Sequence, residues 1–151
     1  PLPGNVIPQC EAFREDGYTT EEVKLQDETR KILGLPDLKV TMTCVRVPVA
    51  VGHAAAILVE TERDLTPGSA EEALRAQPGV VVHSGTDYPT PREIAGRDEV
   101  FIGRVRRDPT HPRRLWLWQA SDNLRKGAAT NAVQIAEELA RRGLLPHSGA
   151  R

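Results

Sequence analysis

The sequence has few of the residues from which disulfide-rich domains and metal sites are built. Its two cysteines, Cys10 and Cys44, do not form a Cys-x-x-Cys pair, and its four histidines are scattered along the chain. Two cysteines are too few to define a disulfide framework, so we expect two reduced, buried thiols. Because the cysteines and histidines do not cluster, we also expect no bound metal.

Long hydrophobic runs and an excess of one charge are also missing. No apolar run approaches the length of about 18 residues that suggests a membrane span. The 20 basic and 21 acidic residues give a net charge of −1. This balance gives no general reason to expect nucleic acid or an anionic membrane as a partner. The 151 residues suffice for one domain with a core.

An N-terminal signal and the familiar cofactor motifs are missing as well. The chain begins Pro1-Leu2-Pro3-Gly4, without a methionine, a basic region or an apolar region. We therefore expect no signal peptide, and a chain that was processed or cut from a longer one. No G-x-G-x-x-G, Walker loop or recognisable nucleophile is present, and Cys44 has no base at a recognisable spacing.

The sequence does contain a regular mixture of strand and helix signals. Apolar or alternating segments bounded by turn residues predict strands at 39–46, 53–61, 80–83, 100–107 and 115–120. Helices are predicted at 20–33, 69–77 and 124–142, with one helical turn at 91–95 and a frayed end at 144–151. This order predicts an α+β fold with a mixed, largely antiparallel sheet and helices on one face.

The ends of the predicted helices depend on capping residues. In a capping box, the first side chain accepts the N–H three residues on, and the Glu at that position reaches back. A glycine that follows a helix readily takes the left-handed conformation that ends it. The predicted N-terminal caps are Thr19 with Glu22, Ser69 with Glu72, and Asp122, and the predicted stops are Gly34 and Gly143.

The centre of the chain holds an arginine and a histidine seven residues apart, Arg46 and His53. In one straight strand, seven steps of about 3.3 Å would place them roughly 23 Å apart on opposite faces. Pro48 and Gly52 both disfavour a continuous strand. We therefore expect a strand ending near Arg46, a bend over 47–52, and a second strand from His53. Such a bend can bring both side chains to one pocket.

Four side chains in this part of the chain allow either a chemical or a structural role. Arg46 can clamp a carboxylate through its two-pronged donor geometry, or it is a paired or solvated arginine at a strand end. His53 can act as a general acid or base, or it is a structural histidine. Glu21 and Lys24 share a helix face, where they can hold a zwitterionic or phosphorylated substrate or form an ordinary ion pair.

Two later segments also allow either a functional or a structural role. Small residues at the start of the last helix, residues 122–129, favour either close approach of an anion or close helix-to-sheet packing. Period two places Arg104 and Arg106 on one strand face, and Trp116 and Trp118 favour core or a subunit interface. The hairpin also contains a cluster of arginines that can bind an anion or nucleic acid, although pairing with carboxylates or exposure to solvent is favoured. These arginines are Arg104, Arg106, Arg107, Arg113 and Arg114.

Nine ordered segments together carry a family resemblance. They are Asn5–Gln9, Glu21–Lys24, Glu28–Leu33, Cys44–Val49, Gly52-His53, Tyr88–Pro91, Gly96–Asp98, Gly103–Asp108 and Asp122–Gln134. In this order they resemble the C-terminal part of bacterial aspartate-semialdehyde dehydrogenases, from Asn5 to about Glu137. So many matches in one order make a stronger signal than any single pair of residues.

The resemblance implies an enzyme that acts on the route to lysine, threonine and methionine. Such an enzyme reduces aspartyl phosphate to aspartate semialdehyde and phosphate with NADPH, through a cysteine thioester. NADP would be bound mainly by an N-terminal domain that this chain lacks. The resemblance further implies a cytoplasmic homodimer, with the fold of the C-terminal domain of glyceraldehyde-3-phosphate-dehydrogenase-like enzymes.

The resemblance also implies roles for individual residues. His53 matches the acid/base partner of the nucleophile, and Arg46 matches the residue that holds the substrate carboxylate. Glu21 and Lys24 match residues that contact the substrate amino group and the phosphate. The residues implied to lie near the nicotinamide are Asn123 and Gly127.

The family's nucleophilic cysteine lies outside this chain, like its dinucleotide-binding domain. We therefore expect residues 1–151 to form a single substrate-binding and dimerisation domain without dehydrogenase activity of its own. The helix at 124–142 would pack on the missing domain, so in this chain its apolar stripe should be exposed or covered by a second copy. The stripe consists of Ala128, Ala132, Ile135 and Leu139. The alternative is a stand-alone interaction module of the same fold. A nucleic-acid role ranks a distant third.

Overall fold

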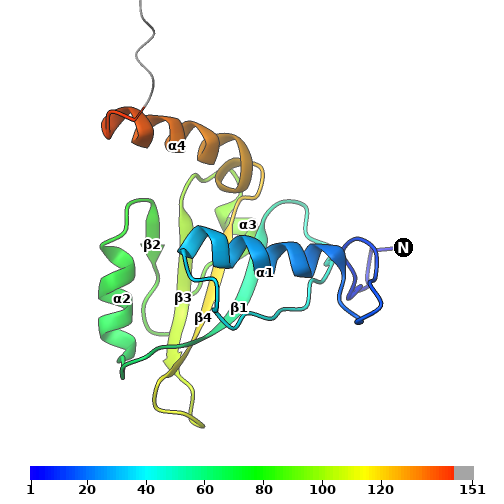
Figure 1. Ribbon diagram of the computed structural model, residues 1–151, viewed down its shortest axis with the longest axis horizontal. Helices are drawn as coiled ribbons and strands as arrows, with labels where there is room; N and C mark the ends of the chain where they lie inside the picture. The colour runs from blue at the N-terminus through cyan, green and yellow to red at the C-terminus, as the bar shows by residue number, and fades with distance from the viewer. Residues whose placement is uncertain (145–151) are drawn as a thin grey trace, which may run out of the picture. The chain divides into compact units, whose positions relative to one another are not determined.

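The computed structural model describes residues 1–144. Two compact units are distinguished, Pro1–Pro48 and Val49–Arg151, and each is described by itself (Figure 1). We predicted a frayed end at 144–151. Of these residues the structure describes only Leu144, which is exposed, and the rest of the prediction lies outside the described residues. Within the described range, no helix combines the length and the apolar character needed to cross a membrane.

The first unit is built on helix α1 (Thr20–Leu33), whose predicted bounds are confirmed. At its start, the Thr19 hydroxyl accepts the N–H of Glu22 at 3.3 Å, and the Glu22 carboxylate accepts the N–H of Thr19 at 2.8 Å. At its end, Gly34 has a φ of 65°, a left-handed conformation that glycine adopts at little cost. The predicted capping box and glycine stop therefore define both ends of α1.

The strand predicted at 39–46 is wrong, because this segment makes one isolated antiparallel bridge, between Ile7 and Arg46. Alternating β-branched residues favour an extended backbone, but a strand also needs a ladder of hydrogen bonds to a neighbour. Here the N–H of Cys44 donates instead to the Glu22 carboxylate at 2.8 Å. A side chain therefore takes the place of a neighbouring strand at this position.

The second unit contains a four-stranded sheet in the order β1-β4-β3-β2. Its strands are β1 (His53–Glu60), β2 (Val80–Val82), β3 (Val100–Arg107) and β4 (Arg114–Ser121). Strand β4 pairs antiparallel with β1 and β3, whereas β2 and β3 are parallel. The predicted α+β fold with a mixed, largely antiparallel sheet is confirmed, as is the strand that starts at His53.

Two helices pack on this sheet. Helix α2 (Pro67–Arg75) packs against β2 and β3, and the one-turn helix α3 (Pro91–Ile94) contacts β4. The predicted capping pair of Ser69 with Glu72 is wrong, because Thr66 is the N-cap and accepts the N–H of Ser69 at 3.1 Å. Pro67 then occupies the first helical position, where its missing N–H needs no partner.

The core lies between α3 and one face of the sheet. Ile94, Phe101 and Ala120 are almost completely buried there. Trp118 shares the face of Ala120, is half-buried, and donates its indole N–H to the C=O of Pro89 at 2.8 Å. Trp118 therefore belongs to the edge of the core, which is one of the two roles predicted for it.

The helix predicted at 124–142 is divided into the π-helical turn η1 (Arg125–Ala129) and helix α4 (Thr130–Arg141). The Asp122 carboxylate accepts the N–H groups of Leu124 and Arg125 at 2.8 and 3.2 Å. The N–H of Gly127 then reaches back five residues to the C=O of Asp122, so the first turn is one residue wider than an α-helix. Asp122 therefore caps the segment as predicted, but its first turn is not α-helical.

Helix α4 lies beyond one end of the sheet (Figure 1). Gly143 follows it with a φ of 68° and donates its N–H to Ala140, which confirms the predicted stop. No residue of α4 is buried, and Ile135 and Leu139 are among its exposed apolar side chains. Of the stripe that we predicted to be exposed or covered by a second copy, Ala132, Ile135 and Leu139 are exposed on α4, whereas Ala128 lies in η1.

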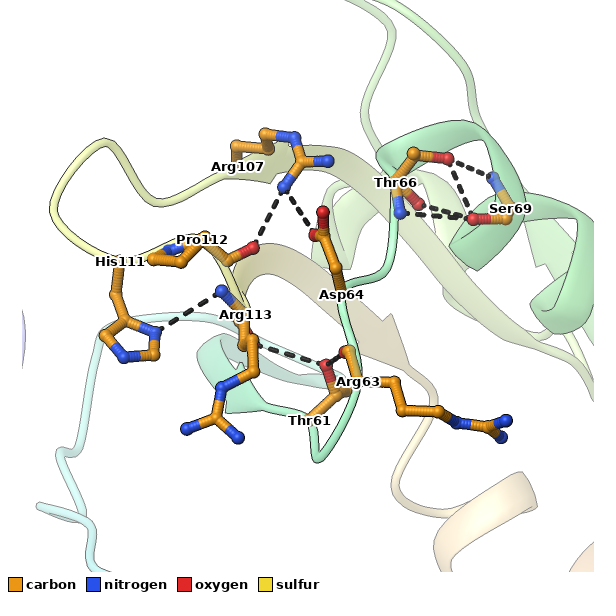
Figure 2. A network of polar contacts seen from close by, with 9 residues as sticks. All are labelled: Thr61, Arg63, Asp64, Thr66, Ser69, Arg107, His111, Pro112 and Arg113. Carbon is orange, nitrogen blue, oxygen red and sulfur yellow. Dashed lines mark hydrogen bonds and ion pairs between the residues drawn. The ribbon is translucent and has the colours of Figure 1, made fainter.

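The arginine hairpin is largely paired with carboxylates. Arg107 contacts Asp64 at 2.9 Å, and Arg114 contacts Glu60 at 2.7 Å, with Arg113 at 3.4 Å from the same Glu60. Figure 2 shows the contact between Arg107 and Asp64, which joins the segment after β1 to the hairpin. The predicted paired face is therefore confirmed for these three arginines.

A β-bulge interrupts β3 in the same hairpin. The register with β4 shifts between Gly103 and Arg106, and Arg104 has a φ of 54°. An inserted residue breaks the alternation of side chains, so period two no longer assigns Arg104 and Arg106 to one face. The Arg106 guanidinium lies 5.7 Å from the centre of the Trp116 ring.

Candidate functional site

Three of the six predicted site residues, Glu21, Lys24 and Arg46, lie in the first unit. Glu21 and Lys24 sit in the first two turns of α1, where the ammonium lies 3.4 Å from the carboxylate and both side chains are at least partly exposed. The arrangement is that of a surface ion pair. It also presents an acceptor for an amino group beside a donor for an anion.

The backbone of Arg46 is fixed although its side chain is exposed. Its N–H donates to the C=O of Ile7 at 2.8 Å, and its C=O accepts the N–H of Ile7 at 3.0 Å. A guanidinium on an anchored backbone can present parallel N–H donors to a carboxylate. The structure is thus compatible with the carboxylate-binding role that the resemblance implies for Arg46.

Glu22 connects helix α1 to Cys44, two residues before Arg46. It is only 5% exposed, and its two carboxylate oxygens accept the N–H groups of Thr19 and Cys44, each at 2.8 Å. These backbone donors, Thr19 first, lower the pKa of Glu22. The sequence identified Glu22 only as a helix cap, because no local pattern reveals a partner 22 residues away.

The two cysteines are free, as predicted, but they are half-buried and not buried as we expected. Burial raises the pKa of Cys44 first, and the neighbouring Cys10 and Glu22 raise it further. A raised pKa disfavours the thiolate that a nucleophile needs. The environment of Cys44 therefore does not favour a nucleophilic role for this thiol.

The other three predicted site residues, His53, Asn123 and Gly127, lie in the second unit. His53 is the first residue of β1, is exposed, and stands opposite Ser121 at the end of β4. The N–H of Gly52 donates to the side-chain oxygen of Asn123 at 2.9 Å. A Cβ added at Gly127 would lie 3.7 Å from the Cβ of Asn123, an ordinary van der Waals distance, so the two residues are neighbours. The end of the sheet thus gathers all three residues.

Two carboxylates hold the π-helical turn η1 beside these residues. Asp122 is buried and accepts the N–H of Gly96 at 2.8 Å as well as those at the start of the turn. Gly96 is the main cause of the lowered pKa of Asp122. Asp98 accepts two bonds from Arg125, at 2.7 and 2.9 Å, and one from Thr130. These bonds, Arg125 first, lower the pKa of Asp98 to about 2.

The site residues divide between the two units, with Arg46 in the first and His53 in the second. That the bend over 47–52 brings their side chains to one pocket stays a prediction. Within residues 1–144, no group of three or more His, Cys, Asp and Glu side chains is placed to hold a metal ion. The first unit therefore presents charged side chains at its surface, and the second presents the exposed imidazole of His53.

Comparisons with known proteins place this arrangement in a family. A family model described as the semialdehyde dehydrogenase dimerisation domain matches residues 1–126. The aspartate-semialdehyde dehydrogenase of Aquifex aeolicus is 49% identical over 144 residues, which cover 93% of this chain and 42% of that protein. The corresponding Bacillus subtilis enzyme is 43% identical over 145 residues, with the same coverage.

Solved structures give the same result. Aspartate semialdehyde dehydrogenase II from Vibrio cholerae, complexed with ASA, has a TM-score of 0.88 at 47% identity and covers 91% of this chain and 41% of its own. The enzyme with NADP from Candida albicans has a TM-score of 0.74 at 26% identity, covering 94% and 46%. The chain thus spans less than half the length of these relatives.

Proposed function

This chain belongs to the semialdehyde dehydrogenase dimerisation-domain family, and from that membership we propose that it is the C-terminal, substrate-binding part of an aspartate-semialdehyde dehydrogenase. The observation that carries the proposal is the 49% identity over 93% of the chain, together with the site residues. The reaction would be the NADPH-dependent conversion of aspartyl phosphate to aspartate semialdehyde and phosphate. It would serve lysine, threonine and methionine synthesis in the cytoplasm.

In this proposal the first unit binds the charged groups of the substrate. Arg46 holds the substrate carboxylate through paired N–H donors. Glu21 accepts from the substrate amino group, and Lys24 attracts the phosphate. The ion pair between Glu21 and Lys24, at 3.4 Å, would open as each partner turns to the substrate. Because the pair is exposed, opening it costs little.

His53 supplies proton transfer in the second unit. As the acid/base partner of a cysteine nucleophile, it would take the thiol proton before attack on the aspartyl carbonyl. The cysteine and the dinucleotide-binding domain would come from a part of the protein outside this chain. The exposed position of His53 at the start of β1 leaves its ring accessible to that part.

The residues at the π-helical turn fit a position beside the nicotinamide of NADP. Gly127 is exposed and has no side chain to block a flat ring, and Asn123 is half-buried beside it. The bound cofactor would supply the hydride. Asn123 and Gly127 would orient its ring, and the apolar stripe of α4 would pack on the cofactor domain.

The first experiment compares the chain with a dehydrogenase chimera, in which residues 5–137 replace the matching part of the Vibrio cholerae enzyme. We expect no measurable turnover of aspartate semialdehyde with phosphate and NADP by the chain alone, because it lacks the nucleophile. We expect turnover by the chimera. Enzyme-like turnover by the chain alone would contradict the proposal. An inactive, folded chimera would favour the stand-alone interaction module.

We also propose that two copies associate through the exposed part, at β1, of the sheet face that also carries Trp118 and Ala120. Leu58 stands opposite Trp116 in the register of β1 and β4, so the two share a face. Leu58 is 42% exposed, and β1 is an edge strand. An exposed apolar sheet face of this kind is typical of an interface between subunits.

Sedimentation of the chain and of two matched variants tests this interface. We expect Leu58→Glu to convert a dimer to a monomer, because the carboxylate would be buried in the interface. Ile135→Glu is the control, since Ile135 is equally apolar and exposed but lies on α4. A monomer produced by Ile135→Glu and not by Leu58→Glu would show that α4 holds the second copy instead.

A further inference from the structure

The backbone immediately before His53 is held by a residue far away in the sequence. The N–H of Gly52 donates to the side-chain oxygen of Asn123 at 2.9 Å, across a separation of 71 residues. Strand pairing places Ser121 opposite His53, so Asn123 lies just past the position where β4 meets His53. The Val51–Gly52 peptide, one peptide before that of His53, is therefore bonded to the segment that leaves β4.

Gly52 is also packed closely, so a side chain at this position would be strained. Its φ is +102°, and an added Cβ would lie 3.1 Å from the Ile94 methyl and 3.3 Å from Pro91. Ile94 is only 2% exposed and belongs to the core. Glycine adopts this left-handed conformation at little cost, and the close packing of the core limits how far the backbone can shift. The Gly52 N–H donates to the carboxamide oxygen of Asn123, and this bond helps to define the direction in which the chain enters β1.

Asn123 is itself held by its neighbours. Asp122, which precedes it, is 3% exposed and accepts backbone N–H groups on both sides, from Gly96 and from Leu124. The Asp98–Arg125 ion pair anchors the turn that follows. Because the Asn123 oxygen accepts from Gly52, the amide N–H donors of the same group remain for another partner. One carboxamide thus lies between the start of β1 and the π-helical turn.

We propose that Asn123 is a positioning residue for His53, acting through the Gly52 peptide, in addition to any contact it makes with the cofactor. The inference rests on the proposed function in that His53 is the acid/base group. Its structural part, the dependence of the start of β1 on Asn123, is independent of that function. A shift of about 1 Å in a catalytic group can cost about a hundredfold in rate.

Three forms of the protein separate the two roles of Asn123. Asn123→Asp keeps an oxygen for the Gly52 N–H but loses the amide donors, whereas Asn123→Ala loses both. A positioning role predicts that in the dehydrogenase chimera Asn123→Ala lowers kcat by about a hundredfold, and that Asn123→Asp recovers most of it. A role in cofactor binding alone predicts a higher KM for NADP in both variants, with Asp no better than Ala.

A measurement on the chain itself makes the test independent of activity. In the 151-residue chain, Asn123→Ala should accelerate hydrogen exchange of the Gly52 amide and increase the backbone mobility of His53 by NMR relaxation, with Asn123→Asp close to the unchanged protein. Unchanged exchange and mobility in a folded Asn123→Ala chain would overturn the proposal. If both respond as expected but the chimera is inactive in every form, the proposed function fails while the positioning contact stands.

Discussion

Replacing His53 by asparagine in the dehydrogenase chimera is expected to lower kcat by about 10²- to 10⁴-fold, the usual contribution of a general acid or base. The KM for aspartate semialdehyde should change little, because binding is assigned to the first unit. A loss confined to kcat is the signature of a group that acts in the transition state. Steady-state kinetics of the two proteins at saturating NADP and phosphate measure this directly.

The structure also predicts that this substitution leaves the fold intact. His53 is exposed, so its ring is not part of the core, and β1 pairs with β4 through the backbone. The thermal unfolding temperature of the His53→Asn variant should therefore match that of the unchanged chain. The control is His111→Asn: His111 lies in the β3–β4 hairpin, where it accepts the N–H of Arg113 (Figure 2). Equal losses of kcat in both variants would refute the assignment of His53.

The elements that the sequence predicted well are those whose signals are local. Helix α1 begins after Thr19 because a capping box needs only residues three apart, and Gly34 ends it through its own backbone freedom. Strand β3 was predicted at its observed bounds, because turn residues flank this segment on both sides. Each of these features is determined within a few residues of chain.

The errors arise where a distant residue supplies the missing bond. Residues 39–46 alternate like a strand, but the Glu22 side chain takes the N–H of Cys44. The last helix begins with a π-helical turn because of Asp122 and the pairing of Asp98 with Arg125. Likewise, the chemical type of His53 and Arg46 was evident from the sequence, whereas the contact from Asn123 to Gly52 has no local signal.

Replacing Glu22 by glutamine is expected to raise the KM for aspartate semialdehyde in the chimera by about ten- to a hundredfold, the scale of a misplaced binding group. Both oxygens of the Glu22 carboxylate accept backbone N–H groups, whereas a glutamine offers one acceptor and one donor. One N–H, that of Thr19 or Cys44, would then face a donor. The segment that carries Arg46 would lose an attachment to α1.

The lowered pKa of Glu22 gives this variant a second, independent signature. Because folding lowers the pKa from its ordinary value of 4.5, the ionised carboxylate stabilises the folded state above that pH. The stabilisation is lost as the pH falls through the lowered pKa. Glu22→Gln should therefore melt at a lower temperature at neutral pH, with the difference shrinking in acid. Glu28→Gln, on an exposed part of α1, is the matched control and should show neither effect.

A double substitution decides whether Glu22 acts on binding through Arg46. If it does, the effect of Glu22→Gln on KM should be much smaller once Arg46→Lys has already removed the paired donors, because coupled residues are not additive. Full additivity of the two effects would mean that Glu22 influences binding by another route, such as the placement of Glu21 and Lys24 on α1. The coupling therefore tests whether the 2.8 Å bond from Cys44 to Glu22 orients the arginine.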